Sequence, residues 1–271
     1  MVSPSVIVAL DGSTLSRSAL PVARSLARIQ AATLHVLHVS EPALCAADAH
    51  DRLGVGGGDA LVVDACGGDP VAAIVEATRR FAPSTVVLAA HSGHPRPASG
   101  LGSVAEGVLR AATSPLVVVP PHRGEVPWEP RSLLLPLDGT PGSAGAVAHA
   151  QRLARVSGAH IELLHVTAPG RSRADEAGTL STPLYADQPQ HEWPAWRDEF
   201  RSRAACRCGD AAAMRVHVAQ GAPGPETLRL AAAEQADLIL VAWHGVLDDA
   251  HAATLRTLLT GANCPVMVVR A

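Results

Sequence analysis

The stretch Ala9-Leu-Asp-Gly-Ser13 returns later in the chain as Pro136-Leu-Asp-Gly-Thr140, at an offset of 127 residues (138 minus 11). Two further pairs share this offset: Leu26-Ala-Arg28 with Leu153-Ala-Arg155, and Leu37-His-Val39 with Leu164-His-Val166. A fixed offset kept over about thirty residues is the signature of internal duplication. The chain is therefore expected to contain two copies of one domain.

The duplication continues beyond two changes of offset. Gly68-Asp-Pro70 matches Gly221-Ala-Pro223, and Ala89-Ala-His91 matches Ala242-Trp-His244, both at 153. The end of each copy, 114–119 and 264–269, matches at 150. The second copy thus gains 26 residues (153 minus 127) between Val166 and Gln220, and loses 3 (153 minus 150) between His244 and Cys264.

The composition is that of a globular protein. Of 271 residues, 48% are hydrophobic and 17% charged, which excludes a disordered chain and allows a core in each copy. The formal net charge of −3 gives no basic footprint, so no nucleic-acid partner is expected.

Cysteine usage and apolar run lengths indicate a cytoplasmic location. The spacing of zinc and redox sites, Cys-x-x-Cys, is absent from the sequence, which favours reduced thiols. The first residues lack the pattern of a signal peptide, and no apolar run approaches the ~20 residues of a membrane helix. We expect no membrane partner.

Strand and helix patterns alternate along each copy. The expected strands of the first copy are 6–10, 33–39, 60–63, 85–90 and 115–119, and the expected helices are 16–28, 70–81 and 103–112. In the second copy the strands fall near 133–137, 161–166, 214–218, 238–242 and 265–269. This alternation predicts an α/β fold of two tandem doubly wound domains, each a five-stranded, mostly parallel sheet with helices on both faces.

The domain boundaries follow from a proline-rich, non-periodic stretch between the copies. We expect domain 1 at 1–121, a linker at 122–131 and domain 2 at 132–271, with an insertion near 169–201. The insertion holds Tyr185, Trp193 and Trp196. Its plain interpretation is a surface excursion held by a few aromatic side chains. The alternative is a lid or partner-docking segment.

Ligands of open parallel sheets bind beyond the carboxyl ends of the strands. In the first copy this predicts that Ala9 and Asp11, at the end of one strand, meet Val39 at the end of the next. The loop that closes in Gly102-Ser103 should join them. The start of the helix that follows offers unpaired N–H groups suited to phosphate.

Taken as a set, these motifs resemble the universal stress protein family, as a tandem member. They are the strand ending in Asp-Gly-Ser, the strand ending in Leu-His-Val, Gly-Asp-Pro before a helix, the loop closing in Leu101-Gly-Ser-Val104, and the final Cys264-Pro-Val-Met-Val-Val269. The resemblance implies a Rossmann-like fold of the adenine nucleotide alpha hydrolase type. It also implies ATP, or another adenine nucleotide, as the ligand.

The nucleotide-binding members carry Gly, two residues, Gly, nine residues, then Gly-Ser or Gly-Thr. Counted back from Gly102, the two earlier glycine positions hold Ala89 and Ser92. Both substitutes are small, so the expected site is weakened rather than abolished. The implied binding residues are Ala9, Asp11, Val39, Ala89, Ser92, Gly102, Ser103 and Val104.

The second copy departs further from the pattern. Ala252-Ala253 stand where Gly102-Ser103 stand in the first, the bulky Trp243 precedes the shortened loop, and Asp248-Asp249 would repel phosphate. We expect the second copy to be degenerate.

Structural roles compete with functional ones at several of these residues. Ser103 begins Ser-Val-Ala-Glu106, a capping box pattern. His38 and His165, in apolar strands at equivalent positions, are interpreted as core histidines. The sequence offers no nucleophile–base pair, Walker lysine or metal-ligand set. We therefore expect no enzyme and no metal, though a slow ATPase activity stays open.

Two functions from different classes stay open. The first is a cytosolic stress protein of regulatory type that binds an adenine nucleotide in domain 1. The second is a protein-interaction module in which both sites are vestigial. The resemblance also implies that the apolar last strands pair between domains, as an intramolecular pseudo-dimer, and a homodimer of whole chains is a further expectation.

Overall fold

The computed structural model describes residues 3–53, 55, 61–91, 100–137, 144–167, 214–243 and 250–270. The expected insertion at 169–201 lies outside these residues, as do Ser92, Asp138 and Asp248-Asp249. Contacts divide the chain into two compact units. Unit 1 comprises Met1–Glu129 with Ala262–Val268, and unit 2 comprises Pro130–Gly261 with Val269–Ala271.

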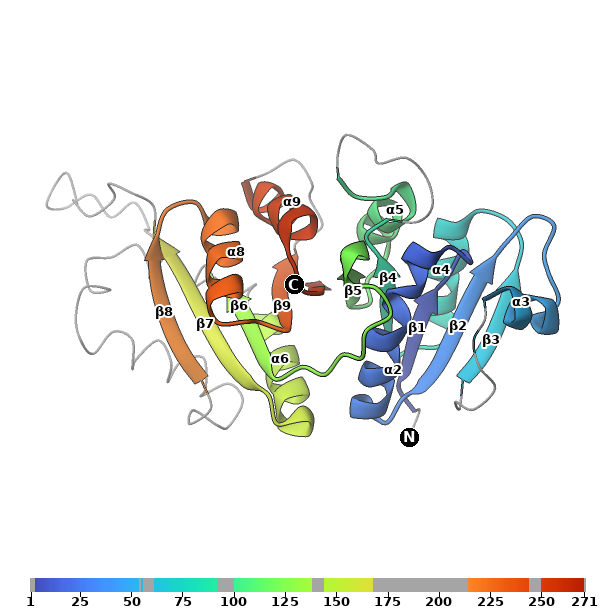
Figure 1. Ribbon diagram of the computed structural model, residues 1–271, viewed down its shortest axis with the longest axis horizontal. Coiled ribbons are helices and arrows are strands. Elements are labelled where there is room, and N and C mark those ends of the chain that lie inside the picture. Colours follow the sequence, from blue (N-terminus) through green and yellow to red (C-terminus); the bar gives the residue numbers. More distant parts are fainter. Residues whose placement is uncertain are drawn as a thin grey trace, which may run out of the picture. The chain divides into compact units, whose positions relative to one another are not determined.

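Unit 1 contains the first copy of the repeat, in which five strands form a parallel sheet with helices on both faces (Figure 1). The strand order is β3-β2-β1-β4-β5. The strands are β1 (Ser5–Ala9), β2 (Thr33–Val39), β3 (Leu61–Cys66), β4 (Ser84–Ala89) and β5 (Leu116–Val119). The helices are α1 (Thr14–Arg17), α2 (Ala19–Gln30), α3 (Ala46–Leu53), α4 (Pro70–Arg80) and α5 (Ser103–Ala111).

Unit 2 repeats the pattern with strands in the order β9-β6-β7-β8. Its strands are β6 (Ser132–Pro136), β7 (His160–Thr167), β8 (Met214–Gln220) and β9 (Leu238–Trp243). Its helices are α6 (Ala144–Ser157), α8 (Pro223–Ala233) and α9 (Ala250–Gly261). The last strand is β10 (Val266–Arg270). Its residues Val266–Val268, grouped with unit 1, pair antiparallel with Leu116–Val118.

The central strands are the most deeply buried part of each unit. Val6, Ile7 and Val8 of β1 are fully buried, and so are Leu133–Leu135 of β6. A strand covered by helices on both faces has no solvated side, which is why these segments read as continuous apolar runs. The α/β fold predicted from the sequence is confirmed.

The two copies keep the same strand register. Leu37 of β2 lies opposite Asp64 of β3, and Leu164 of β7 lies opposite His217 of β8. These pairs are related by the offsets 127 and 153 that the sequence motifs gave. Equivalent residues of the two copies can therefore be compared directly.

The histidines at equivalent strand positions have the expected structural role. His38 and His165 are buried, and the Nδ1 atom of each lies at hydrogen-bond distance from a backbone carbonyl, 2.8 Å from Leu10 and 3.1 Å from Leu137. Since a carbonyl only accepts, Nδ1 carries the proton in both rings. Each histidine thus ties the second strand of its copy to the end of the first strand.

Three local features differ from the sequence expectation. The helix expected at 16–28 is broken at Ser18, whose hydroxyl donates to the Leu15 carbonyl at 2.7 Å and ends α1. The helix α3 occupies a stretch expected to be loop. The strand β3 runs to Cys66, three residues beyond the expected end. In each case a short or weakly apolar segment carried too little periodicity to be recognised.

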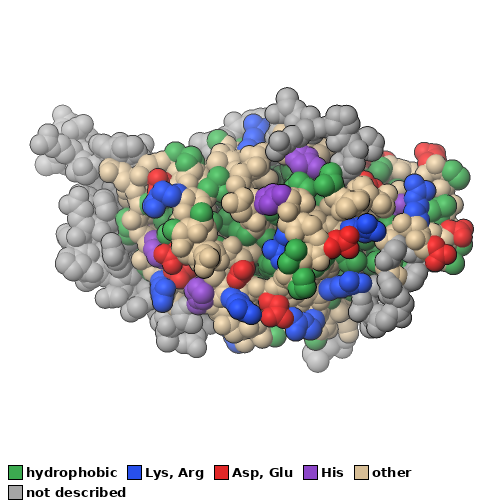
Figure 2. Space-filling view, in the orientation of Figure 1, with side chains coloured by type: hydrophobic (Ala, Val, Ile, Leu, Met, Phe, Trp, Pro, Cys, Tyr) green, Lys and Arg blue, Asp and Glu red, His purple; other side chains and the backbone are tan. Residues whose placement is uncertain are grey.

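The expected linker is held against unit 1 as far as Glu129. Its Glu125 and Glu129 form ion pairs with Arg17 and Arg28, at 3.0 and 2.7 Å. Trp128 between them is buried. Acidic and basic side chains are interspersed on the face shown in Figure 2, in keeping with the small net charge. No helix in the described part of the chain has the length and apolarity needed to cross a membrane.

Candidate functional site

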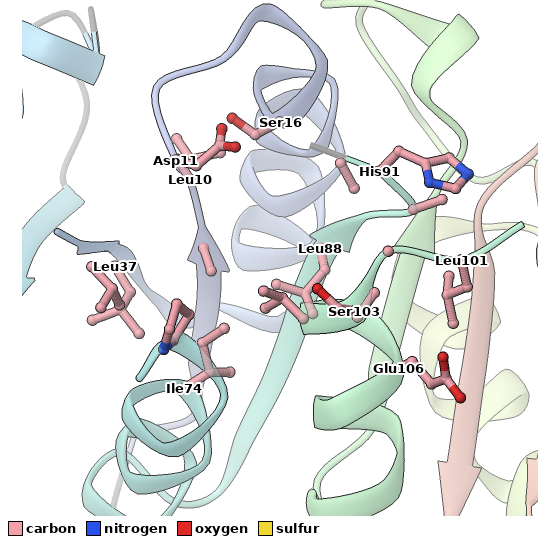
Figure 3. Close-up of a pocket in the computed structure, with 18 residues that line it drawn as sticks. Leu10, Asp11, Ser16, Leu37, Ile74, Leu88, His91, Leu101, Ser103 and Glu106 are labelled. Atoms are coloured by element: carbon pink, nitrogen blue, oxygen red, sulfur yellow. The ribbon is translucent and has the colours of Figure 1, made fainter. Parts of the chain in front are cut away.

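A cleft of about 510 Å³ opens in unit 1 at the carboxyl ends of β1, β2 and β4 (Figure 3). The helices α4 and α5 complete its walls. The lining residues are Ala9, Leu10, Asp11, Ser16, Leu37, Val39, Pro70, Ile74, Leu88, Ala89, Ala90, His91, Leu101, Gly102, Ser103, Val104, Ala105 and Glu106. The cleft lies where open α/β sheets bind their ligands.

One end of the cleft is bordered by a tight turn after β1. The Asp11 carboxylate accepts a hydrogen bond from the Ser13 amide at 2.8 Å, which closes the turn. The Ser13 hydroxyl then accepts from the Ser16 amide at 3.1 Å and caps α1. Asp11 is exposed, and its Oδ1 atom accepts the hydrogen bond of the turn. The structural and functional interpretations of Asp11 are therefore compatible.

The opposite end is formed by the start of α5. Gly102 is the N-cap residue, and it has no side chain with which to cap this end. The Gly102 amide donates to the Ala90 carbonyl at 2.8 Å, and a Cβ atom at this position would lie 3.2 Å from that oxygen. A side chain here would require this carbonyl to shift by a few tenths of an ångström, and glycine avoids that contact.

The capping-box interpretation of Ser103 is wrong. Ser103 is the first residue of α5 rather than its cap, and the Glu106 amide bonds to the Gly102 carbonyl instead. The Ser103 side chain is exposed and lies at the centre of the cleft in Figure 3. With the amides of the first helical turn it offers hydrogen-bond donors toward the cleft, a suitable place for an anion.

The walls between the two ends are apolar. The apolar side chains here include Leu37 and Val39 of β2, Ile74 of α4 and Leu88 of β4. Pro70 and Ile74 were missed in the sequence, although Gly68-Asp-Pro70 marks a helix that starts at the same end of the sheet. The arrangement suits a flat apolar ring with a polar group at either end.

The charged groups around the cleft are few. Asp11 lies at one end, and Glu106 lies one turn along α5, where its carboxylate pairs with Arg110 at 2.6 Å. Among the described lining residues there is no arginine, and His91 is the one basic side chain. Positive potential in the described part of the cleft therefore comes mainly from the α5 dipole.

Seven of the eight residues expected to bind a ligand line this one cleft. They are Ala9, Asp11, Val39, Ala89, Gly102, Ser103 and Val104. The eighth, Ser92, lies outside the described residues. Residues from four separate segments of the chain are thus brought together.

The corresponding region of unit 2 is built differently. Trp243 stands at the position of Ala90, which lines the cleft of unit 1, and its side chain is 3% exposed. The helix α9 begins at Ala250, so Ala252 lies within its first turn, whereas the equivalent Gly102 is the N-cap that precedes α5. The second copy therefore has no glycine N-cap at the equivalent position.

Comparison with known proteins places the fold in a family. The model of the universal stress protein family matches residues 45–120 and 130–270. A search of the curated proteins finds no match.

Among solved structures, a universal stress protein from Archaeoglobus fulgidus DSM 4304 is similar to this chain, with a TM-score of 0.65 and 15% identity. The match covers 98% of this chain and 96% of that one. A functionally unknown protein from Pseudomonas aeruginosa PAO1 matches with a TM-score of 0.67, 17% identity, and coverage of 98% and 92%. Two family segments spanning most of the chain, on a fold shared over nearly its full length, lead to one conclusion: the chain belongs to the universal stress protein family.

Proposed function

We propose that the protein is a non-enzymatic, cytosolic regulator whose unit 1 binds ATP or another adenine nucleotide in the described cleft. The observation that carries this proposal is the convergence of Ala9, Asp11, Val39 and the Gly102-Ser103 turn on one cavity. Among the described residues, the cysteines Cys45, Cys66 and Cys264 are in no disulfide, which supports a reducing compartment.

The two ends of the cleft differ in the chemistry they offer. Leu37, Val39 and Ile74 form an apolar slot in which an adenine ring would be desolvated. Asp11 beside that slot offers a carboxylate to a donor on the ligand. The N–H groups at the start of α5 and the Ser103 hydroxyl would receive the phosphates.

The second copy is proposed to be degenerate. A buried indole at position 243 and the early start of α9 replace the small residue and the glycine turn that shape the cleft of unit 1. One nucleotide per chain is the stoichiometry that follows.

Isothermal titration with ATP, ADP and AMP in the presence of magnesium tests the proposal. We expect one site per chain. Ser103→Ala removes a hydroxyl donor and should weaken binding by about tenfold, the effect of one charge-assisted hydrogen bond. Ala253→Ser, at the equivalent position of unit 2, is the matched control and should change nothing. Absence of heat at sub-millimolar nucleotide would rule against the proposal.

The rival function is a protein-interaction module. The replacement of a family glycine by Ala89 and the absence of arginine from the described lining favour it. Under this alternative no nucleotide binds, and a pull-down depends on Trp193 and Trp196. If deletion of 169–201 left the set of captured proteins unchanged, this alternative would be wrong.

We further propose domain boundaries of 1–121 and 132–271, and an association of the two copies as an intramolecular pseudo-dimer. Two family segments in one chain supply both halves of such a pair. A protease site introduced between Gly124 and Glu125 tests this. The two cut halves should co-elute in size exclusion at micromolar concentration, and separate elution would contradict the pseudo-dimer. The same measurement on the uncut chain decides whether whole chains form a homodimer.

A further inference from the structure

The two copies carry the same acid–histidine pair with its polarity reversed. In unit 1, His35 Nδ1 of β2 lies 3.0 Å from Asp64 Oδ2 of β3. In unit 2, Glu162 Oε2 of β7 lies 2.6 Å from His217 Nε2 of β8. The offsets 127 and 153 relate His35 to Glu162 and Asp64 to His217. The inner strand thus supplies the histidine in one copy and the acid in the other.

Both pairs are set in surroundings where a wrong partner is costly. Glu162 is 0% exposed, and its other oxygen, Oε1, lies 3.6 Å from Arg215 Nη1 and 3.5 Å from His160 Nε2. His35 is 8% exposed and stacks on the Phe81 ring, with 3.8 Å between centroids. Val62 stands in unit 1 where Arg215 stands in unit 2. A buried carboxylate that loses its cationic partners carries an uncompensated charge.

A contact between two helices is also exchanged between the copies, and here it is the sizes of the two residues that change places. In unit 1 a Cβ atom at Gly107 of α5 would lie 2.7 Å from Val71 Cγ2 of α4. In unit 2 a Cβ atom at Gly224 of α8 would lie 2.8 Å from Thr257 Cβ of α9. Val71 and Gly224 are equivalent, as are Gly107 and Thr257. The larger side chain comes from the first helix in one copy and from the second helix in the other.

Both acid–histidine pairs and both helix contacts join one segment to the rest of its unit. We call residues 61–80 (β3 and α4) edge block 1, and residues 214–233 (β8 and α8) edge block 2. Each block begins with a strand that lies at an end of the strand order. Among the described strands, that strand therefore pairs with one neighbour only, and this neighbour alone can select it. Both blocks follow long connections in the chain, a circumstance that permits exchange of a segment between similar partners.

We propose that the reversed pairs form a matching code by which each edge block docks only on its own copy. If the blocks were exchanged, Asp64 would face the buried Glu162, and Val62 would replace Arg215. His35 would face His217 and Arg215, three basic groups with no acid. In the helical layer Val71 would collide with Thr257, while Gly224 would leave a gap against Gly107. Exchange of edge block 1 for edge block 2, within one chain or between two chains, is therefore disfavoured both in the strands and in the helices.

Four chains separate this code from ordinary stability. Glu162→His with His217→Asp gives unit 2 the same arrangement of acid and histidine as unit 1. The acid–histidine pairs then no longer distinguish edge block 1 from edge block 2. His35→Glu with Asp64→His gives unit 1 the polarity of unit 2, with the same consequence. The chain with all four substitutions has reversed pairs again. The fourfold variant controls for the substitutions themselves, because it contains every change present in the other two variants and yet keeps the pairs of the two units different, as in the wild type.

The readout is the exchanged dimer formed on refolding. Isotopically light and heavy chains are unfolded in urea, mixed and refolded at 20 °C, then diluted, and native mass spectrometry counts the light–heavy dimers that persist. Exchanged dimers persist because their separation requires unfolding. We expect about a tenfold rise for either single reversal, the scale of one like-charge contact, and a return to the wild-type level for the fourfold variant. Equal levels in all four chains, or a rise in the fourfold variant, would overturn the proposal.

The helical half of the code is tested separately. Val71→Gly with Gly107→Thr gives unit 1 the helix pairing of unit 2 and should also increase persistent dimers. If either strand variant fails to refold, this variant still decides the matter, since it leaves both acid–histidine pairs untouched. No increase in persistent dimers with this variant would contradict the code in the helical layer.

Discussion

Single residues differ between the two copies at the carboxyl ends of the strands. Gly102 allows the loop to pass 2.8 Å from the Ala90 carbonyl, and this places the start of α5 at the cleft. Trp243 occupies the position of Ala90 in the second copy and is buried there. A small residue that lines the cleft of unit 1 is therefore replaced in unit 2 by a large buried side chain.

The cysteines provide a prediction at this scale. Burial and the nearby Asp64 carboxylate raise the pKa of the Cys66 thiol, whereas Cys45 is exposed. Because the thiolate is the nucleophile, iodoacetamide at pH 8 should modify Cys45 faster than Cys66. Asp64→Asn removes the charge and should accelerate the modification of Cys66. Asp48→Asn, near Cys45, is the control and should leave Cys66 unchanged. Peptide mass spectrometry gives both rates, and equal rates in the wild type would contradict the prediction.

His149 of α6 gives a dependence of stability on pH. Burial, and then the adjacent Arg152 charge, lower its pKa below the ordinary value of 6.5. The unfolded chain then binds more protons than the folded chain between the two pKa values, so this contribution to stability is complete above about pH 6.5 and is lost as the pH falls. In urea unfolding between pH 7.5 and 5, His149→Gln should flatten the decline. An unaltered slope would show that His149 has no part in it.

At the scale of elements, the ends of equivalent helices show how the copies have drifted. Ala31 ends α2 in the left-handed region at φ 48°, and Gly158 stands at the equivalent position after α6 at φ 75°. A side chain is strained in this region and glycine is not. The second copy carries the residue that the local backbone favours.

This difference predicts opposite effects of matched substitutions. Ala31→Gly should raise the free energy of unfolding of unit 1 by about 1 kcal/mol, and Gly158→Ala should lower that of unit 2 by about the same amount. Urea titration followed by hydrogen exchange in α2 and α6 assigns each change to its unit. Stabilisation by Gly158→Ala would contradict the argument.

The same element scale shows where sequence patterns suffice. The runs at Val6–Val8 and Leu133–Leu135 are apolar because their strands are covered on both faces. These strands could therefore be predicted from the sequence. The helix α3 and the break at Ser18 could not be predicted in this way, because they depend on a few local hydrogen bonds within short segments. The start of α5 at Ser103 was expected, but its cap was assigned to the wrong residue.

At the scale of the whole molecule, duplication has produced two units with one fold and different surroundings for a ligand. A nucleotide bound to unit 1 alone would stabilise that unit by mass action and leave the other unaffected. With ATP at about a hundred times its dissociation constant, the stabilisation of unit 1 would be about 2.7 kcal/mol.

Hydrogen exchange with and without ATP measures this asymmetry. Amides of β1, β2 and the first turn of α5 should exchange more slowly with the ligand, while those of β6, β7 and α9 should not change. Ser103→Ala should reduce the protection in unit 1. Equal protection of both units would show that the second copy binds as well, and would contradict its proposed degeneracy.

The sequence by itself determined the duplication, the α/β fold and the family, because these depend on apolar runs and repeated motifs read along the chain. It also named seven of the residues that line the cleft, since the ends of parallel strands must converge. Only the tertiary structure decided that Gly102 caps α5, that Pro70 and Ile74 close the cleft, and that His35 meets Asp64 while Glu162 meets His217. These contacts join residues far apart in the chain, and their distances and burial depend on how strands and helices pack.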